Sequence, residues 1–211
     1  MLAPTAFLAL AMQCSPAVHP ETAFDVARVE SNFNPYAIAE IIPKAERSAT
    51  KTRVISHFPT NKTEAIARIK QIEAKKHRYS VGLMQITSTN FARFGMTAEK
   101  LLSPCHNLTV FEKIFTDCYR RGGSLKRALS CYYAGNFTTG QQPEAQFAKT
   151  SYVERIGLSD NQKYQVPATK TFLQTKSKVL TNSQFADKPV VHWPREVIRG
   201  VPATLKNSSS I

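Results

Sequence analysis

Glu30 is a carboxylate at a position where the helical pattern expects an apolar side chain. Residues 20–35 are predicted to form a helix whose apolar face carries Ala23, Val26 and Phe33. At 3.6 residues per turn, Glu30 falls among them. Burial removes the hydration of a carboxylate, so it raises the pKa of Glu30 and keeps the group protonated, as a general acid must be. The alternative is a half-solvated glutamate at a helix end without a chemical role.

Two further motifs follow this glutamate along the chain. The three motifs are Glu30-Ser31, Gly82-Leu83-Met84-Gln85-Ile86 and Cys131-Tyr132-Tyr133-Ala134-Gly135-Asn136. In this order they resemble the signature of soluble lytic transglycosylases, the goose-lysozyme-like enzymes that cut peptidoglycan. The Asn-Pro-Tyr-Ala-Ile sequence at 34–38 and the long stretch before Gly82 are more specifically similar to the transglycosylases of type IV secretion systems. The resemblance covers about residues 3–140 and implies a lysozyme-like domain.

The resemblance also implies a mechanism with one carboxyl group. Glu30 would protonate the glycosidic oxygen between N-acetylmuramic acid and N-acetylglucosamine, and the 2-acetamido oxygen of the muramic acid would stabilise the oxocarbenium ion. Glu30 would then take the proton of the 6-hydroxyl, which closes a 1,6-anhydro ring. This reaction needs no metal and no cofactor. It would serve to open the cell wall locally for a secretion or conjugation apparatus.

The other motif residues are expected to bind the glycan. Ser31 resembles the family serine that contacts the acetamido group. Glycine at position 82 would let the backbone approach the sugar closely. Met84 and Gln85 correspond to residues that line the central subsites, where Gln85 would hydrogen-bond the substrate and Met84 would pack on it.

The two tyrosines of the third motif have alternative interpretations. Tyr132 matches the family tyrosine that orients the acetamido group or the catalytic glutamate. Tyr133 replaces the common asparagine, which puts the hydrogen bond of that asparagine in doubt. Core packing at a helix end is the alternative for both residues.

A second catalytic carboxylate is not evident in the sequence. Glycosidases normally use two carboxylates, but Asp25 lies about 140° around the helix from Glu30, and nothing fixes Glu40 or Glu46 near it. Hydrolysis and anhydro-ring formation need the same acid, so a lysozyme-type hydrolase stays open. A non-catalytic peptidoglycan-binding assembly factor is the other alternative.

The chain is predicted to contain one domain and a tail. Residues 1–150 form a predominantly α-helical α+β domain, in which the insertion at residues 37–79 carries a strand or hairpin near 52–58 and a helix that begins after Asn61. Residues 151–211 are expected to be a basic, largely disordered tail. Val190, Val191 and Trp193 in this tail form a possible docking patch for secretion-apparatus subunits, and a solvated extension is the alternative.

Charge and hydropathy exclude some function classes. Residues 1–150 carry 19 Lys and Arg against 11 Asp and Glu (+8), and residues 151–211 carry nine against four (+5), which gives the net charge of +13. The excess is spread along the chain without a nucleic-acid-binding motif, so an anionic wall polymer is the expected partner and nucleic acid is not. A solvated surface charge that aids solubility is the alternative. No run approaches the roughly 18 apolar residues of a membrane span. Residues 2–17 lack the basic start of a signal peptide and are predicted to be a helix of the domain.

Four cysteines fit the periplasm, which permits disulfides, and the cell envelope is the expected location. The residues are Cys14, Cys105, Cys118 and Cys131. Cys118 and Cys131 lie on consecutive predicted helices that could pack side by side, but the sequence does not choose among the pairings, and free buried thiols remain an alternative. The histidines lack ligand spacing, so no metal site is expected.

Overall fold

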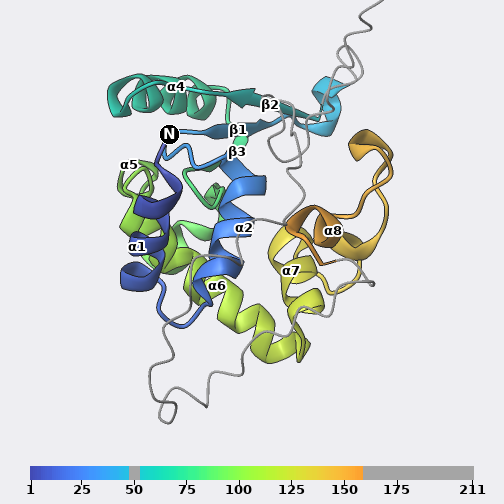
Figure 1. Cartoon of the computed structure of the whole chain (residues 1–211). Helices are drawn as coiled ribbons and strands as arrows, with labels where there is room; N and C mark the ends of the chain where they lie inside the picture. Colours follow the sequence, from blue (N-terminus) through green and yellow to red (C-terminus); the bar gives the residue numbers. More distant parts are fainter. Residues whose placement is uncertain (48–52, 159–211) are drawn as a thin grey trace, which may run out of the picture.

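The computed structural model describes residues 1–47 and 53–158. It confirms a predominantly helical α+β fold (Figure 1). The α-helices are α1 (Pro4–Cys14), α2 (Pro20–Ser31), α4 (Lys62–Ala74), α5 (Ala98–Leu101), α6 (Pro104–Gly122), α7 (Leu125–Ala134) and α8 (Tyr152–Ile156). The short 3-10 helices are η1 (Lys44–Glu46), η2 (Ser88–Asn90), η3 (Ala92–Phe94), η4 (Thr139–Gln141) and η5 (Ala145–Phe147).

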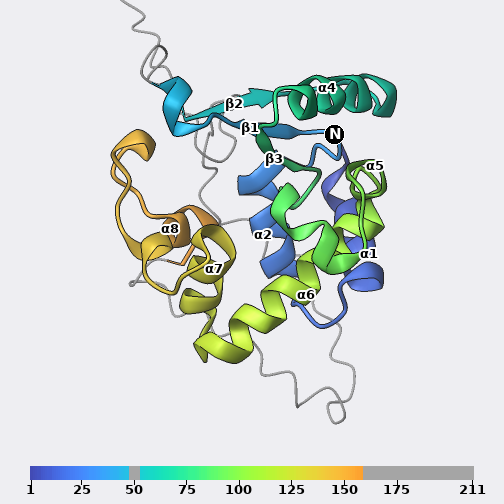
Figure 2. The same ribbon diagram turned by 180° about the vertical axis from the view of Figure 1, so that it is seen from behind.

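A four-stranded antiparallel sheet begins directly after α2 along the chain. Its strands are β1 (Ile38–Ile41), β2 (Val54–His57), β3 (Arg78–Val81) and β4 (Ile86–Thr87), in the order β2-β1-β3-β4. The strand predicted near 52–58 is β2, and its pairing with β1 confirms the predicted hairpin. Helix α4 and strands β1 and β2 lie together at one end of the molecule, away from α7, as the two opposite views show (Figures 1 and 2).

The helix that carries Glu30 begins where predicted but ends earlier. Pro20 is its first residue, and the ring of His19 accepts a hydrogen bond from the backbone N–H of Glu21. Asn32 and Phe33 have φ angles of 49° and 61°. This left-handed backbone ends α2 at Ser31 and turns the chain towards β1, so the predicted extension of the helix to residue 34 was wrong.

Local capping chemistry explains α4 better than it explains α6. Asn61 accepts the backbone N–H of Glu64 at 2.9 Å and starts α4 as predicted. Asn107 was predicted to start the next long helix, but α6 begins at Pro104. Asn107 is fully buried inside α6, where its side chain is used for a tertiary contact.

One continuous core lies between α1, α2, α6, α7 and the sheet. Phe7, Ala11 and Cys14 of α1 are buried in it, which confirms the predicted N-terminal helix. Disulfides join Cys14 to Cys105 and Cys118 to Cys131. The first ties the end of α1 to the start of α6, and the second ties α6 to α7.

The core extends beyond the boundary predicted at residue 150. Residues 152–156 form α8, whose side chains Tyr152, Val153 and Ile156 are between 1% and 3% exposed. Figure 1 shows α8 beside α7. The start of the predicted tail is therefore wrong, because these residues have too much apolar surface to remain in solvent. The rest of that tail, with its predicted docking patch, lies outside the described residues.

Candidate active site

Glu30 lies in the last turn of α2 with its side chain fully buried. The Tyr152 hydroxyl donates a hydrogen bond to Glu30 Oε1 at 2.7 Å. The apolar neighbours predicted for it, Ala23, Val26 and Phe33, are all buried. The predicted burial of Glu30 is thus confirmed.

Ser31 joins α2 to the second motif. Its hydroxyl donates to the carbonyl of Leu83 at 2.8 Å and lies 3.2 Å from the carbonyl of Ala27. The side chain is 2% exposed. Because its single proton is used within the protein, only the oxygen of Ser31 is available to a ligand, as an acceptor.

The second motif is a tight turn between β3 and β4 that Asn107 holds from α6. Asn107 donates to the carbonyls of Val81 and Leu101 at 3.0 and 2.8 Å and accepts the Met84 N–H at 2.8 Å. A Cβ on Gly82 would lie 2.2 Å from the Asn107 Nδ2, and the φ angle of Gly82 is 81°. Gly82 is therefore required because the Asn107 side chain approaches it closely. The prediction from the sequence was instead the close approach of a sugar to this glycine.

Gln85 is held in the same turn with a left-handed φ of 49°. Its amide nitrogen donates to the carbonyls of Ala37 and Gly82 at 3.1 and 3.0 Å. Its Oε1 is buried and has no hydrogen-bond partner within the described part of the chain. Such an acceptor is costly unless a water molecule or a ligand donor reaches it.

Met84 and Tyr132 lie deeper than their predicted roles require. The Met84 side chain is fully buried in the core, so contact with a glycan would need its exposure. Tyr132 donates its hydroxyl to the Met84 carbonyl, and its ring packs edge-on against Phe111 with centroids 5.2 Å apart. These contacts join α7 to the second motif.

Tyr133, a predicted site residue, contacts a group of aromatic and charged side chains that the sequence did not predict as part of the site. Its ring stacks on Tyr152, with centroids 4.3 Å apart and an interplanar angle of 14°. Its hydroxyl donates to Glu144 Oε2 at 2.8 Å, and Arg155 donates to Glu144 Oε1 at 2.9 Å. Tyr133 thus lies next to the tyrosine that contacts Glu30.

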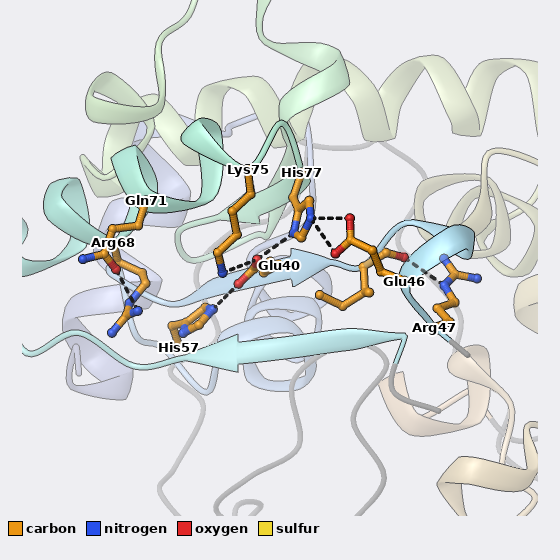
Figure 3. A network of polar contacts seen from close by, with 9 residues as sticks. Glu40, Glu46, Arg47, His57, Arg68, Gln71, Lys75 and His77 are labelled. Carbon is orange, nitrogen blue, oxygen red and sulfur yellow. Dashed lines mark hydrogen bonds and ion pairs between the residues drawn. The ribbon is translucent and has the colours of Figure 1, made fainter. Parts of the chain in front are cut away.

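The remaining candidate carboxylates are engaged elsewhere. Asp25 pairs with Arg28, also on α2, at 3.3 Å, and both side chains are partly buried. Glu40, on β1, lies in the network of Figure 3, together with histidines of two other segments. Its Oε2 meets His57 at 2.9 Å and its Oε1 meets His77 at 2.7 Å.

The same network is completed by Lys75 and Glu46. Lys75 donates to Glu40 at 3.2 Å, and His77 contacts Glu46 at 3.1 Å. Burial raises the pKa of Glu40, but its contacts with His57, His77 and Lys75 outweigh this and lower it. For His77, burial lowers the pKa and the two glutamates raise it above its ordinary value. Two of the histidines that looked scattered in the sequence, His57 and His77, therefore meet at one buried carboxylate.

A helix signal could have identified Tyr152. Ser151 and Glu154 have the spacing of a capping box, and the structure forms it: Ser151 Oγ accepts the Glu154 N–H at 3.2 Å, and the Glu154 carboxylate accepts the Ser151 N–H at 2.7 Å. Gly157 follows at the C-cap. No sequence signal of this kind marks Glu144 or Arg155, because their contacts join separate elements.

Within residues 1–47 and 53–158, none of the helices is long and apolar enough to cross a membrane. The same ranges hold no group of three or more His, Cys, Asp or Glu side chains that is arranged to bind a metal ion.

Comparison with known proteins finds bacterial relatives, one of which is named as a type IV secretion system protein. The type IV secretion system protein virB1 of Brucella abortus biovar 1 (strain 9-941) is 38% identical over 162 residues, which cover 72% of this chain and 63% of the relative. Protein virB1 of Agrobacterium fabrum is 34% identical over 137 residues, or 62% of this chain and 52% of the relative. The X polypeptide of Escherichia coli K12 is 32% identical over 110 residues, or 49% and 65%. This chain therefore matches about half to two thirds of the length of these relatives.

The family comparison agrees with the geometry. No solved structure matches the chain significantly. The model of the transglycosylase SLT domain matches residues 7–154, a range that includes Glu30, the 82–85 turn, both tyrosines of α7 and Tyr152. The match ends within α8, which agrees with a core that extends past residue 150. The chain belongs to the transglycosylase SLT domain family.

Proposed function

We propose that this protein is a lytic transglycosylase that cleaves the β-1,4 bond between N-acetylmuramic acid and N-acetylglucosamine in peptidoglycan. The observation that carries the proposal is the fully buried carboxyl group of Glu30, which receives the Tyr152 hydroxyl beside the 82–85 turn. Burial disfavours the charged form of a carboxyl group. A neutral Glu30 has a proton to give to the glycosidic oxygen, as general acid catalysis requires.

The proposed reaction returns the enzyme to its starting state. Glu30 protonates the leaving oxygen while the bond from that oxygen to the anomeric carbon breaks, and the acetamido oxygen of the muramic acid stabilises the positive charge. The Glu30 carboxylate then accepts the proton of the 6-hydroxyl, whose oxygen bonds to the anomeric carbon. The product is a 1,6-anhydro sugar, and no water, metal or cofactor is consumed.

Gln85 and Ser31 are proposed to contact the glycan. Gln85 Oε1 can accept a hydrogen bond from a substrate N–H or O–H, which would satisfy its buried acceptor. Ser31, whose proton is held by Leu83, can accept one from the acetamido N–H. Tyr152 is proposed to act on Glu30 instead: its hydroxyl donates to the Glu30 carboxyl group and would stabilise the carboxylate after the proton has left.

Substrate access must involve a movement of the protein. Glu30, Gln85 and Tyr152 are each at most 1% exposed. A pocket between α2, α7 and α8 does not include them; it is lined by Thr22, Asp25, Leu125, Ile156, Gly157 and Leu158. A glycan can reach Glu30 only after side chains that cover it have moved.

The biological setting follows from the names of the relatives. Two of them are called virB1, one of which is named as a type IV secretion system protein. We infer that this protein acts in the periplasm or cell envelope, where it opens the wall locally for assembly of such an apparatus. Subunits of the apparatus are the proposed partners of the segment after residue 158.

The direct test is mass spectrometry of peptidoglycan digested by the wild-type protein, Glu30→Gln and Asp25→Asn. The wild type should release anhydro-muropeptides. Glu30→Gln should lower the rate by about 10²–10⁴-fold, the usual contribution of a general acid. Asp25→Asn is the matched control on the same helix and should keep wild-type activity, because Asp25 lies about 140° around the helix from Glu30 and its ion pair with Arg28 is only partly buried.

Each other result selects an alternative. Products with reducing ends would indicate a lysozyme-type hydrolase. Peptidoglycan binding without cleavage would favour a non-catalytic assembly factor. Wild-type turnover by a folded Glu30→Gln protein would remove Glu30 from the mechanism.

A further inference from the structure

The chain between α7 and α8 makes a closed turn that places one carboxylate. Glu144 and Thr150 form an isolated β-bridge, in which the Glu144 N–H donates to the Thr150 carbonyl at 3.2 Å. Ala148 and Lys149 complete the turn with φ angles of 51° and 61°. Non-glycine residues rarely adopt this left-handed backbone. The turn therefore fixes the position of Glu144 next to α8.

Glu144 and Arg155 form a largely buried ion pair. The Arg155 side chain is 3% exposed and that of Glu144 is 19% exposed, with 2.9 Å between nitrogen and oxygen. Arg155 also donates to the Thr150 carbonyl at 3.1 Å, and its guanidinium carbon lies 3.8 Å from the centroid of the Phe147 ring. Removing one partner of such a pair leaves an uncompensated charge in a poorly solvated place. The pair thus strongly prefers one arrangement.

The other oxygen of Glu144 orients the tyrosine stack. Glu144 Oε2 accepts the hydroxyl of Tyr133 at 2.8 Å. The Tyr133 ring lies flat against Tyr152 at 4.3 Å, and Tyr152 reaches Glu30 at 2.7 Å. Arg155 is three residues after Tyr152 on α8. Both the stacked ring and the helix that carries Tyr152 are therefore fixed by the same ion pair.

We propose that Glu144 and Arg155 are positioning residues, which act through Tyr133 and Tyr152 to keep the Tyr152 hydroxyl on Glu30. The proposal rests on the proposed transglycosylase function. Tyr152 has to keep its hydrogen bond to Glu30 while the carboxyl group loses and regains its proton. Without the ion pair the stack can rotate or shift, and a displacement of 1 Å at a reacting group can lower a rate by about 100-fold.

The test compares kcat and KM on soluble peptidoglycan strands for the wild type, Glu144→Gln and Arg155→Met. Glu144→Gln keeps the shape of the side chain, so it tests the charge if Arg155→Met does not fold. Both variants should lower kcat by about 10- to 100-fold with little change in KM. The control is Arg120→Met, because Arg120 pairs with Asp117 at the same distance of 2.9 Å but is 80% exposed; its kcat should be unchanged.

A second comparison separates positioning from general destabilisation. In a Tyr152→Phe background, Arg155→Met and Glu144→Gln should have no further effect on kcat, although they still lower the melting temperature. A merely structural pair would lower kcat by the same factor in both backgrounds. That result, or wild-type kcat in folded Glu144→Gln, would overturn the proposal.

A readout without turnover keeps the two proposals distinguishable. In protein labelled with ¹³C at the tyrosine phenol carbon, Tyr152→Phe assigns the signal of Tyr152. This signal should shift or broaden in Glu144→Gln and stay unchanged in Arg120→Met. If the wild type cleaves no peptidoglycan, the function fails, and this spectrum alone decides whether the pair holds Tyr152.

Discussion

At the scale of single residues, the residues of the three motifs have two kinds of role. Glu30 and Gln85 present groups that chemistry can use, a buried carboxyl group and a buried acceptor. Gly82 and Met84 instead shape the turn that contains Gln85. Gly82 leaves room for the Asn107 side chain, and the Met84 N–H donates to Asn107 Oδ1. Mutating a motif residue therefore tests either chemistry or packing, and the contacts say which.

Gly82→Ala should destabilise the protein more than Gly95→Ala does. Both glycines have positive φ angles, 81° and 61°, but a Cβ at Gly95 meets nothing within 4 Å, whereas one at Gly82 meets Asn107 at 2.2 Å. Backbone strain alone is expected to cost roughly 1–3 kcal/mol in either variant, and the clash should add roughly 1–3 kcal/mol at Gly82. Chemical denaturation of both variants measures the difference, and equal free energies of unfolding would contradict this account.

At the scale of elements, the insertion is a sheet organised around one carboxylate. Glu40 on β1 bonds His57 on β2 and His77 just before β3, while Lys75 comes from the end of α4. The same strands hold the 82–85 turn at their other end, where the Gly82 N–H and the Gln85 side chain donate to the Ala37 carbonyl. The network and the turn thus share β1 and β3.

The contribution of this network to stability should be largest between about pH 4.5 and 6.5. The pKa of Glu40 is lowered from 4.5, so its contribution is present above that value and is lost as the pH falls through the lower folded pKa. The pKa of His77 is raised from 6.5, so its contribution is complete below 6.5 and is lost as the pH rises through the higher folded pKa. His57, Lys75 and Glu46 are the other titratable groups in the network.

Urea denaturation at several pH values checks this prediction. The quantity to compare is the difference in the free energy of unfolding between the wild type and Glu40→Gln at each pH. The difference should shrink on both the acid and the alkaline side. The control is Asp117→Asn, because the arginines next to Asp117 lower its pKa without any histidine. Its difference should shrink only on the acid side. A flat profile for Glu40→Gln would contradict the role of the network.

At the scale of the whole molecule, distant parts of the chain enclose the site. Glu30 and Tyr152 are 122 residues apart, and the Cys14–Cys105 disulfide closes a separation of 91 residues. The Cys118–Cys131 disulfide fastens α7, which carries Tyr132 and Tyr133, to α6. The site therefore depends on the packing of α8 and α7 onto the rest of the fold.

Ending the chain after Thr150 should abolish cooperative melting, whereas ending it after Leu158 should leave a folded protein. The shorter chain loses the buried side chains of Tyr152, Val153 and Ile156. At about 1.5–3 kcal/mol each, this loss rivals the total stability of about 5–15 kcal/mol of an ordinary domain. Calorimetry of the two chains decides, and cooperative melting of the chain that ends at Thr150 would restore the earlier boundary.

The sequence by itself determined the features that depend on neighbours along the chain. Periodicity placed Glu30 on the buried face of α2, and capping residues located α4. It failed where distant segments meet: it ended the domain before Tyr152, left the cysteine pairing open, read Asn107 as a cap and treated His57 and His77 as unrelated. A helix repeats every 3.6 residues and so leaves a pattern in the sequence. A contact between residues far apart leaves none, because it is decided only when burial of the whole core brings the elements together, and in this protein those contacts complete the site around Glu30.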